Sequence, residues 1–107
     1  MNHFLDWRDF QGSQPEKFFK TTLWQASAVT VGLNCLEPGQ AQSIHAHDGA
    51  DKVYFVLSGT GSFTVGEQTQ SAAAGMLVLA PAGMPHGVRN EGSESLSVLV
   101  CIAPPIK

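Results

Sequence analysis

The sequence predicts an all-β domain, either a sandwich or a closed barrel. Short runs of β-branched and aromatic residues recur along its 107 residues and are separated by glycine, proline and asparagine, a pattern typical of such folds. No segment has a sustained helical periodicity, and the only helical feature we expect is a short turn around Pro15–Phe18. A chain of this length can bury one small core, so a single domain spanning residues 1–107 is expected.

Nine segments fit the strand pattern, and turn residues bound most of them. In chain order, the expected strands are Phe18–Gln25, Ala28–Leu36, Gln42–His47, Lys52–Ser58, Gly61–Val65, Gln68–Ala72, Met76–Ala80, His86–Asn90 and Leu96–Ile102. Turns are expected at Glu37–Gly39, Asp48–Gly49, Ser58–Gly59, Gly66–Glu67, Ala74–Gly75, Pro81–Gly83 and Asn90–Gly92. We assign residues 28–102 to the barrel core and residues 1–27 to an N-terminal segment that covers the barrel.

Two of the expected strands are apolar on both faces. Alternate residues of a strand face opposite sides, so Lys52, Tyr54 and Val56 would face inward while Val53, Phe55 and Leu57 face outward. The last strand repeats this pattern, with Leu96, Val98, Val100 and Ile102 on one face and Leu99 and Cys101 on the other. Such strands must be covered on both sides.

The outer apolar face of these strands can be covered in two ways. The N-terminal segment offers the aromatic residues Phe4, Trp7, Phe10, Phe18, Phe19 and Trp24. We expect this segment to provide part of the cover and a second subunit to provide the rest, which predicts a homodimer through a sheet face. The alternative is that the N-terminal segment folds back and covers the whole face within one chain.

Composition excludes several classes of partner. A net charge of -3, a pI near 5.7 and the absence of a basic run argue against nucleic-acid binding. No apolar stretch approaches the roughly 20 residues that span a bilayer, and the first residues lack the apolar region of a signal peptide. We therefore expect no membrane partner and a cytoplasmic location, in which Cys35 and Cys101 stay reduced.

Three of the four histidines have spacings that suit one metal site. His45 and His47 are two residues apart, so on an extended strand their side chains leave the same face. A metal held by two imidazoles needs a further ligand from elsewhere, and His86 is the candidate. The predicted cofactor is a divalent ion (Fe, Mn, Ni or Zn). A single histidine on a strand is more often a packing or surface residue, and His3 is expected to be one.

With these residues in view, the chain resembles the cupin family, in its small single-domain form. The family's first motif is matched by Gly39, His45, His47 and Gly59, and the second by Gly75, Pro81, Gly83, His86 and Asn90. The resemblance covers residues 39 to 90 and implies a double-stranded β-helix, or jelly roll, with a metal in the mouth of the barrel. From their residue types, Gly39, Gly59 and Gly75 are expected at tight corners, and Asn90 is expected to tie down a turn.

The sequence departs from the cupin pattern at the position of the family's glutamate ligand, which is occupied by Lys52 beside Asp51. A protonated lysine about 5 Å from a divalent ion would be repelled by roughly 7 kcal/mol at an effective dielectric of about 20. Three interpretations follow. Lys52 turns out of the pocket and leaves a three-histidine site, a bulge rotates Asp51 inward as a ligand, or Lys52 stays inside and pairs with an anionic substrate. We rank the three-histidine site first and the Asp51 ligand second.

The pocket is expected to be small and largely apolar, which suits a small organic ligand. Its candidate lining residues are Tyr54, Val56, Met84, Val88, Leu77 or Leu79, and Phe63 or Val65. Tyr54 and Lys52 are the candidate catalytic residues. The leading hypothesis is a three-histidine, metal-dependent enzyme of the dioxygenase type that acts on a small chelating or anionic substrate. The alternative is a non-catalytic module that binds a small ligand, a carbohydrate or a metal. A sugar isomerase or epimerase ranks third, because such chemistry needs proton-transfer groups.

Overall fold

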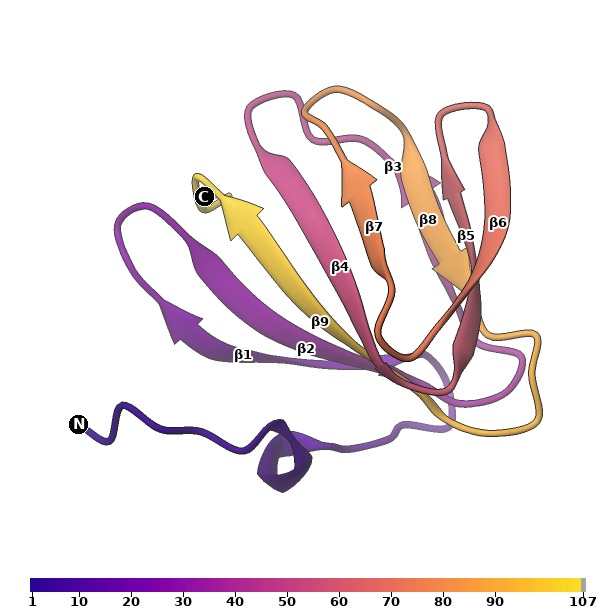
Figure 1. Cartoon of the computed structure of the whole chain (residues 1–107), viewed down its shortest axis with the longest axis horizontal. Helices are drawn as coiled ribbons and strands as arrows, with labels where there is room; N and C mark the ends of the chain where they lie inside the picture. Colours follow the sequence, from indigo (N-terminus) through magenta and orange to yellow (C-terminus); the bar gives the residue numbers. More distant parts are fainter. Residues whose placement is uncertain (107) are drawn as a thin grey trace.

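The computed structural model describes residues 1–106 and consists of two facing antiparallel sheets (Figure 1). In chain order the elements are the 3-10 helix η1 (Trp7–Phe10) and strands β1 (Phe19–Gln25), β2 (Thr30–Leu36), β3 (Ala41–His45), β4 (Asp51–Ser58), β5 (Thr60–Val65), β6 (Gln68–Ala73), β7 (Leu77–Ala80), β8 (His86–Arg89) and β9 (Leu96–Ala103). One sheet has the order β1-β2-β9-β4-β7 and the other β3-β8-β5-β6. The predicted jelly-roll barrel is confirmed, and so are the nine strands.

The core lies between the two sheets and follows the predicted alternation. The buried hydrophobic cluster consists of Leu36, Tyr54, Val56, Phe63, Ala72, Val88, Leu96, Val98 and Val100. On β4 the inward residues Lys52, Tyr54 and Val56 are buried, whereas Val53, Phe55 and Leu57 are only partly buried. The parity argument from the sequence is therefore confirmed for this strand.

The expected helical turn at Pro15–Phe18 is wrong. Residues 15–17 form bends, and the short helix is at Trp7–Phe10, where Asp6 caps its start by accepting the Arg8 N–H at 3.0 Å. The side-chain amide of Gln40 donates to the carbonyls of Gln14 at 2.6 Å and Lys17 at 3.0 Å. Because these carbonyls bind a side chain from the β2–β3 turn, the segment is held as irregular chain.

Several corners of the barrel depend on residues that the sequence singled out. Gly39, Gly59 and Gly75 all have positive φ angles, of 88°, 81° and 95°, a conformation that favours glycine. Asn90 is fully buried, and its side-chain amide donates to the carbonyls of Leu36 and Glu94, both at 2.8 Å. The predicted role of Asn90 as a turn residue is confirmed.

The outer face of the five-stranded sheet is apolar and only partly covered. Register places two rows of apolar side chains across it: Val31, Cys101, Val53 and Leu79 in one, and Leu33, Leu99, Phe55 and Leu77 in the other. The N-terminal segment runs beside the β1 side of this sheet (Figure 1), where Leu5 and Trp7 share a hollow of about 590 Å³ with Trp24. On β7, Leu77 and Leu79 remain 59% and 61% exposed.

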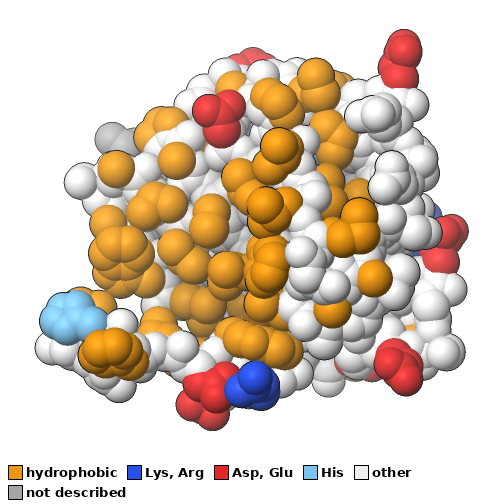
Figure 2. Space-filling view, in the orientation of Figure 1, with side chains coloured by type: hydrophobic (Ala, Val, Ile, Leu, Met, Phe, Trp, Pro, Cys, Tyr) orange, Lys and Arg blue, Asp and Glu red, His pale blue; other side chains and the backbone are white. Residues whose placement is uncertain are grey.

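Figure 2 shows the result as a broad band of hydrophobic side chains across the molecule, with charged groups mainly toward its margins. Within the described chain, the N-terminal segment thus covers only part of the face. No helix among residues 1–106 has the length and hydrophobicity needed to cross a lipid bilayer.

Candidate metal centre

The barrel brings His45, His47 and His86 together. His45 is the last residue of β3 and His86 is the first of β8, and the two are direct partners in the β3–β8 ladder. His47 follows two residues after β3 ends, so the predicted strand stops earlier than expected although the side chain still joins the group. One ring nitrogen from each residue lies within 4.8 Å of the others. We call these three residues the histidine group.

Hydrogen bonds orient two of the rings. Nδ1 of His45 lies 2.8 Å from the Ser43 carbonyl, and Nδ1 of His86 lies 2.9 Å from the Met84 carbonyl. If each Nδ1 carries the proton and donates it, each Nε2 is left with a free lone pair. A hydrogen bond from the ring nitrogen that does not bind the metal is the usual way in which proteins orient a metal-binding histidine.

The environment of His86 favours a ligand at its other nitrogen. Its Nε2 is a buried polar atom with no hydrogen-bond partner among residues 1–106. Burial, chiefly, lowers the pKa of both His86 and His47, and the charge of Lys52 lowers them further. Neutral imidazole is the form that binds metals. A three-nitrogen set with bond lengths of roughly 2.1 Å would need only a small closing movement, so the residues fit a divalent ion.

Asp51 lies on β4 but is not brought to the histidine group. It is exposed, and its carboxylate accepts the Ala82 N–H at 2.9 Å, which fastens the loop that leads to His86. The bulge proposed for this position is not present, because Asp51 and Lys52 pair in continuous register with Ala103 and Ile102 of β9. Asp51 therefore supports the site from outside.

The same loop is also tied to His47. Gly83 has a φ of 79° and its N–H donates to the His47 carbonyl at 2.8 Å. The left-handed conformation at Gly83 favours glycine. The loops that carry His47 and His86 are thus joined directly, which limits the freedom of both histidines before any ligand arrives.

Lys52 does not turn out of the barrel, contrary to our first interpretation. It is only 4% exposed and lines the same cavity as His45 and His47, with its Nζ 4.8 Å from the centre of the Tyr54 ring. Burial, with a contribution from the charge of Lys20, lowers the pKa of Lys52 to about 8. The position of the side chain is the one required by the third interpretation, while the histidine group itself contains no carboxylate.

Tyr54 is placed differently from the prediction. It is completely buried in the core and does not line the cavity. Its hydroxyl donates to Oε1 of Gln42 at 2.6 Å, and burial raises its pKa. Gln42 does line the cavity. Tyr54 therefore borders the site from the core side: its ring lies 4.8 Å from the Lys52 ammonium and 6.1 Å from the His86 ring, and its hydroxyl orients Gln42.

The cavity beside the histidine group is polar, which corrects the expectation of an apolar pocket. It has a volume of about 610 Å³ and is lined by Lys20, Thr21, Thr22, Gln25, Thr30, Gly32, Asn34, Gln42, His45, His47, Lys52, Val100, Ile102 and Ile106. We call it the polar cavity. The sequence reasoning missed its β1 and β2 wall, because polar residues such as Lys20 and Asn34 become neighbours only when those strands pair.

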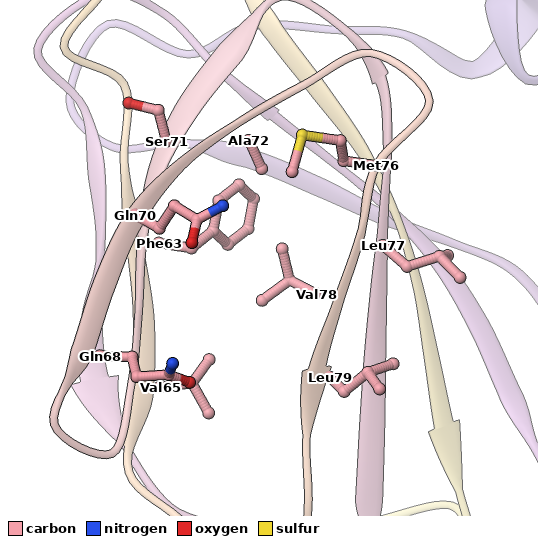
Figure 3. Close-up of a pocket in the computed structure, with 10 residues that line it drawn as sticks. All are labelled: Phe63, Val65, Gln68, Gln70, Ser71, Ala72, Met76, Leu77, Val78 and Leu79. Atoms are coloured by element: carbon pink, nitrogen blue, oxygen red, sulfur yellow. The ribbon is translucent and has the colours of Figure 1, made fainter.

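Several residues expected around the metal line another hollow instead. Phe63, Val65, Leu77 and Leu79 border a space of about 280 Å³ between β6 and β7. Figure 3 shows Val78 on the β7 side of this space, with Phe63, Gln68 and Gln70 on the facing side. No histidine and no charged residue lines it. It is therefore separate from the metal centre.

Comparisons with known proteins agree with this architecture. The sequence profile of the family described as "Cupin domain" matches residues 32–102. The chain is 42% identical to TT1209 from Thermus thermophilus, whose crystal structure superposes with a TM-score of 0.93 over 96% of this chain and 98% of that one. It is 43% identical to the uncharacterized protein SCO3923 of Streptomyces coelicolor, over 72% of this chain and 71% of the relative.

A more distant relative has a name that refers to a ligand. The oxalate-binding protein of Thermotoga maritima is 30% identical over 67 residues, which are 63% of this chain and 55% of that protein. The match thus spans only about half the length of the relative.

Proposed function

Since the chain belongs to the cupin family, we propose that it binds a divalent metal through His45, His47 and His86 and, with it, a small chelating organic anion. The observation that carries this proposal is the convergence of the three ring nitrogens beside the buried ammonium of Lys52. When bound, a divalent ion (Fe, Mn, Ni or Zn) would supply Lewis acidity and open coordination positions for a chelating ligand.

The residues of this chain would contribute charge and orientation. Three neutral imidazoles leave the charge of a bound cation uncompensated, which favours an anionic ligand. Lys52 adds a second positive charge on the same side of the barrel and would pair with the ligand's anionic group. Gln42, which is held by the Tyr54 hydroxyl, would orient a polar group of the ligand.

The reaction that we propose is of the dioxygenase type, in which molecular oxygen oxidises the chelated substrate. A carboxylate-free set of nitrogen ligands and an anion-attracting cavity support this choice. An isomerase or epimerase is less well supported, because no aspartate or glutamate lines the described part of the cavity to transfer protons.

A non-catalytic binding module is the second candidate. It is favoured by the same lack of lining carboxylates, by the buried position of Tyr54, and by the oxalate-binding protein found as a 30% identical relative. The two candidates share the metal and the anionic ligand and differ only in turnover.

We also propose that two copies associate through the outer face of the five-stranded sheet. Its two cross-strand rows contain no charged side chain, so two identical faces meet without repulsion in a two-fold dimer. The N-terminal segment leaves Leu77 and Leu79 exposed, and a second copy would cover them. Both cysteines are free, which is in keeping with the cytoplasmic location that we propose.

Elemental analysis tests the metal site directly. The purified wild-type chain should retain close to one equivalent of metal, and His86→Ala should lose most of it. His3→Ala is the matched control, because His3 is exposed and outside the histidine group, and it should retain the wild-type amount. Equal metal content in all three would refute the site.

Oxygen uptake then separates the two candidates. An iron-loaded sample is mixed with chelating acids while binding is followed by calorimetry. Oxygen consumption that requires both iron and a bound acid supports the enzyme. Heat of binding without oxygen consumption across the panel supports the binding module.

A further inference from the structure

We propose that Gly87 is a positioning residue for the metal centre, because its lack of a side chain makes room for a bulge in β3 that turns His45 into the polar cavity. The inference rests on the proposed function, since it explains how one ligand of that same site is aimed. Gly87 does not line the polar cavity, so it would act only through the backbone of the neighbouring strand.

The ladder between β3 and β8 is irregular beside the histidine group. The register shifts between Gln42 and His45, so that residues 43–44 of β3 oppose the single residue Gly87 of β8. Two residues opposite one form a β-bulge, a feature that re-aims side chains next to functional sites. We call residues 43–44 the bulge, and both of them are exposed.

The bulge decides which face of the sheet His45 occupies. Gln42 and His45 are three residues apart, so on a regular strand their side chains would point to opposite faces. Both nevertheless line the polar cavity. The extra residue in the bulge reverses the face that the following residues present. Ile44, which would face inward on a regular strand with Gln42, is instead 61% exposed.

The bulge also sets the orientation of the His45 ring. Nδ1 of this ring lies 2.8 Å from the carbonyl oxygen of Ser43, which is one of the two bulge residues. A hydrogen bond donated by Nδ1 leaves the lone pair of Nε2 free to bind a metal. A shift of the bulge backbone would therefore move the acceptor that aims the ring.

The backbone of β3 approaches Gly87 so closely that a side chain would not fit. A Cβ atom at this position would lie 2.8 Å from the Gln42 carbonyl oxygen and 3.1 Å from Cα of Ile44. Because both neighbours are backbone atoms, a methyl group could be accommodated only by moving the bulge. The φ angle of Gly87 is not positive, so the requirement for glycine here is steric.

Zinc titrations of the full chain by calorimetry test this role. Gly87→Ala should bind zinc roughly tenfold more weakly or worse, the usual effect of disturbing a group that orients a metal-binding histidine. Gly61→Ala is the matched control, because an added Cβ there would lie 2.7 Å from Cδ2 of Leu96, in the core and not at the bulge. The control should lower the free energy of unfolding of the metal-free chain and keep the wild-type zinc affinity.

Two results of these titrations would overturn the inference. One is an unchanged zinc affinity in a folded Gly87→Ala variant. The other is an equal loss of affinity in Gly61→Ala, which would mean that any strain in the barrel weakens the site.

A double-mutant cycle shows whether the effect passes through His45. In the His45→Ala background, the further change Gly87→Ala should alter the remaining zinc affinity by less than about twofold, because the ring that the bulge aims is already absent. A loss as large as that in the wild-type background would mean that Gly87 acts on another part of the site, contrary to the inference.

Nitrogen NMR of the isotopically labelled, metal-free chain separates this inference from the proposed function. At about pH 8, where imidazole is neutral, His45 of the wild type should be protonated at Nδ1. Gly87→Ala should lose this preference, because the Ser43 carbonyl is displaced. If the wild type bound no zinc, the proposed function would fail, and a change of tautomer would still support the role of Gly87. An unchanged tautomer would refute that role even in a chain that binds zinc.

Removal of the bulge provides a rescue experiment if Gly87→Ala alone does not fold. Deletion of Ile44 leaves one residue of β3 opposite position 87, so the ladder becomes regular and the collision with the bulge is removed. Gly87→Ala should then fold in the shortened chain, as measured by circular dichroism and urea unfolding. A shortened chain that folds with glycine but not with alanine at position 87 would show that the bulge is not what requires Gly87.

Discussion

His45 and His86 are direct partners across the β3–β8 ladder, with ring centroids 4.5 Å apart. The contact between these two residues, far apart in sequence, is therefore set by backbone pairing and does not depend on a flexible loop. A ligand that bridges them binds the folded state and has no equivalent site in the unfolded chain.

The first prediction concerns metal and stability. Zinc or nickel at a hundred times its dissociation constant should raise the free energy of unfolding by about 2.7 kcal/mol, and a chelator should reverse the effect. His47→Ala should lose most of this stabilisation while unfolding cooperatively without metal. Thermal unfolding with and without metal measures both. An equal gain in His47→Ala would indicate that the metal binds elsewhere.

The second prediction concerns Lys52, which is buried and forms no ion pair with any of residues 1–106. Its folded-state pKa of about 8 lies below the ordinary lysine value of 10.5, so between these two pH values the unfolded chain binds more protons than the folded chain. The free energy of unfolding of the metal-free protein should therefore rise as the pH increases from about 8 to about 10.5. Below pH 8 the full cost applies, on the order of 3 kcal/mol.

Lys52→Met should remove this cost. The variant should be more stable than the wild type at pH 7, by up to about 3 kcal/mol, and the difference should shrink to nearly zero by pH 10.5. Urea unfolding of both proteins at several pH values measures it. A constant difference across this range would mean that Lys52 titrates normally in the folded chain.

Much of the fold was predictable from sequence because its signals are local. Apolar and polar residues alternate along the strands, and turn residues recur between them. The positive φ angles at Gly39, Gly59 and Gly75 occur at the corners where glycine was expected. The histidine group was also predictable, since the spacing of His45 and His47 and the loop before His86 are local features.

The polar cavity was not predictable in the same way. Its wall consists of Lys20 and Asn34, which become neighbours only through the register of β1 against β2. Alternation predicted correctly that Lys52 faces inward, but the direction of its long side chain depends on packing against Tyr54. Tyr54 itself was assigned to the pocket because parity alone does not separate a core residue from a cavity residue.

The third prediction compares two glycines with similar backbone angles. Gly59 has a φ of 81°, and an added Cβ would collide with the Ser95 carbonyl, whereas Gly39 has a φ of 88° and open space around that position. Gly39→Ala should cost about 1 kcal/mol from backbone strain alone. Gly59→Ala should cost more, by roughly 1–3 kcal/mol, because the backbone at Ser95 and Leu96 must also move away. Urea unfolding measures both, and equal costs would show that the contact relaxes freely.

The last prediction concerns the outer face of the five-stranded sheet. Leu79→Lys introduces a charge into the exposed end of one apolar row, on β7. Two such faces would bring like charges together in a dry interface. The variant should therefore be a monomer of 11.4 kDa, whereas the wild type should be a dimer. Ile44→Lys is the matched control, since Ile44 is also 61% exposed but belongs to β3 in the other sheet, and it should leave the wild-type mass unchanged. Light scattering after size-exclusion chromatography measures the mass of each. A wild-type chain that elutes as a monomer would refute the dimer, and a control that dissociates while Leu79→Lys stays paired would move the interface to the four-stranded sheet.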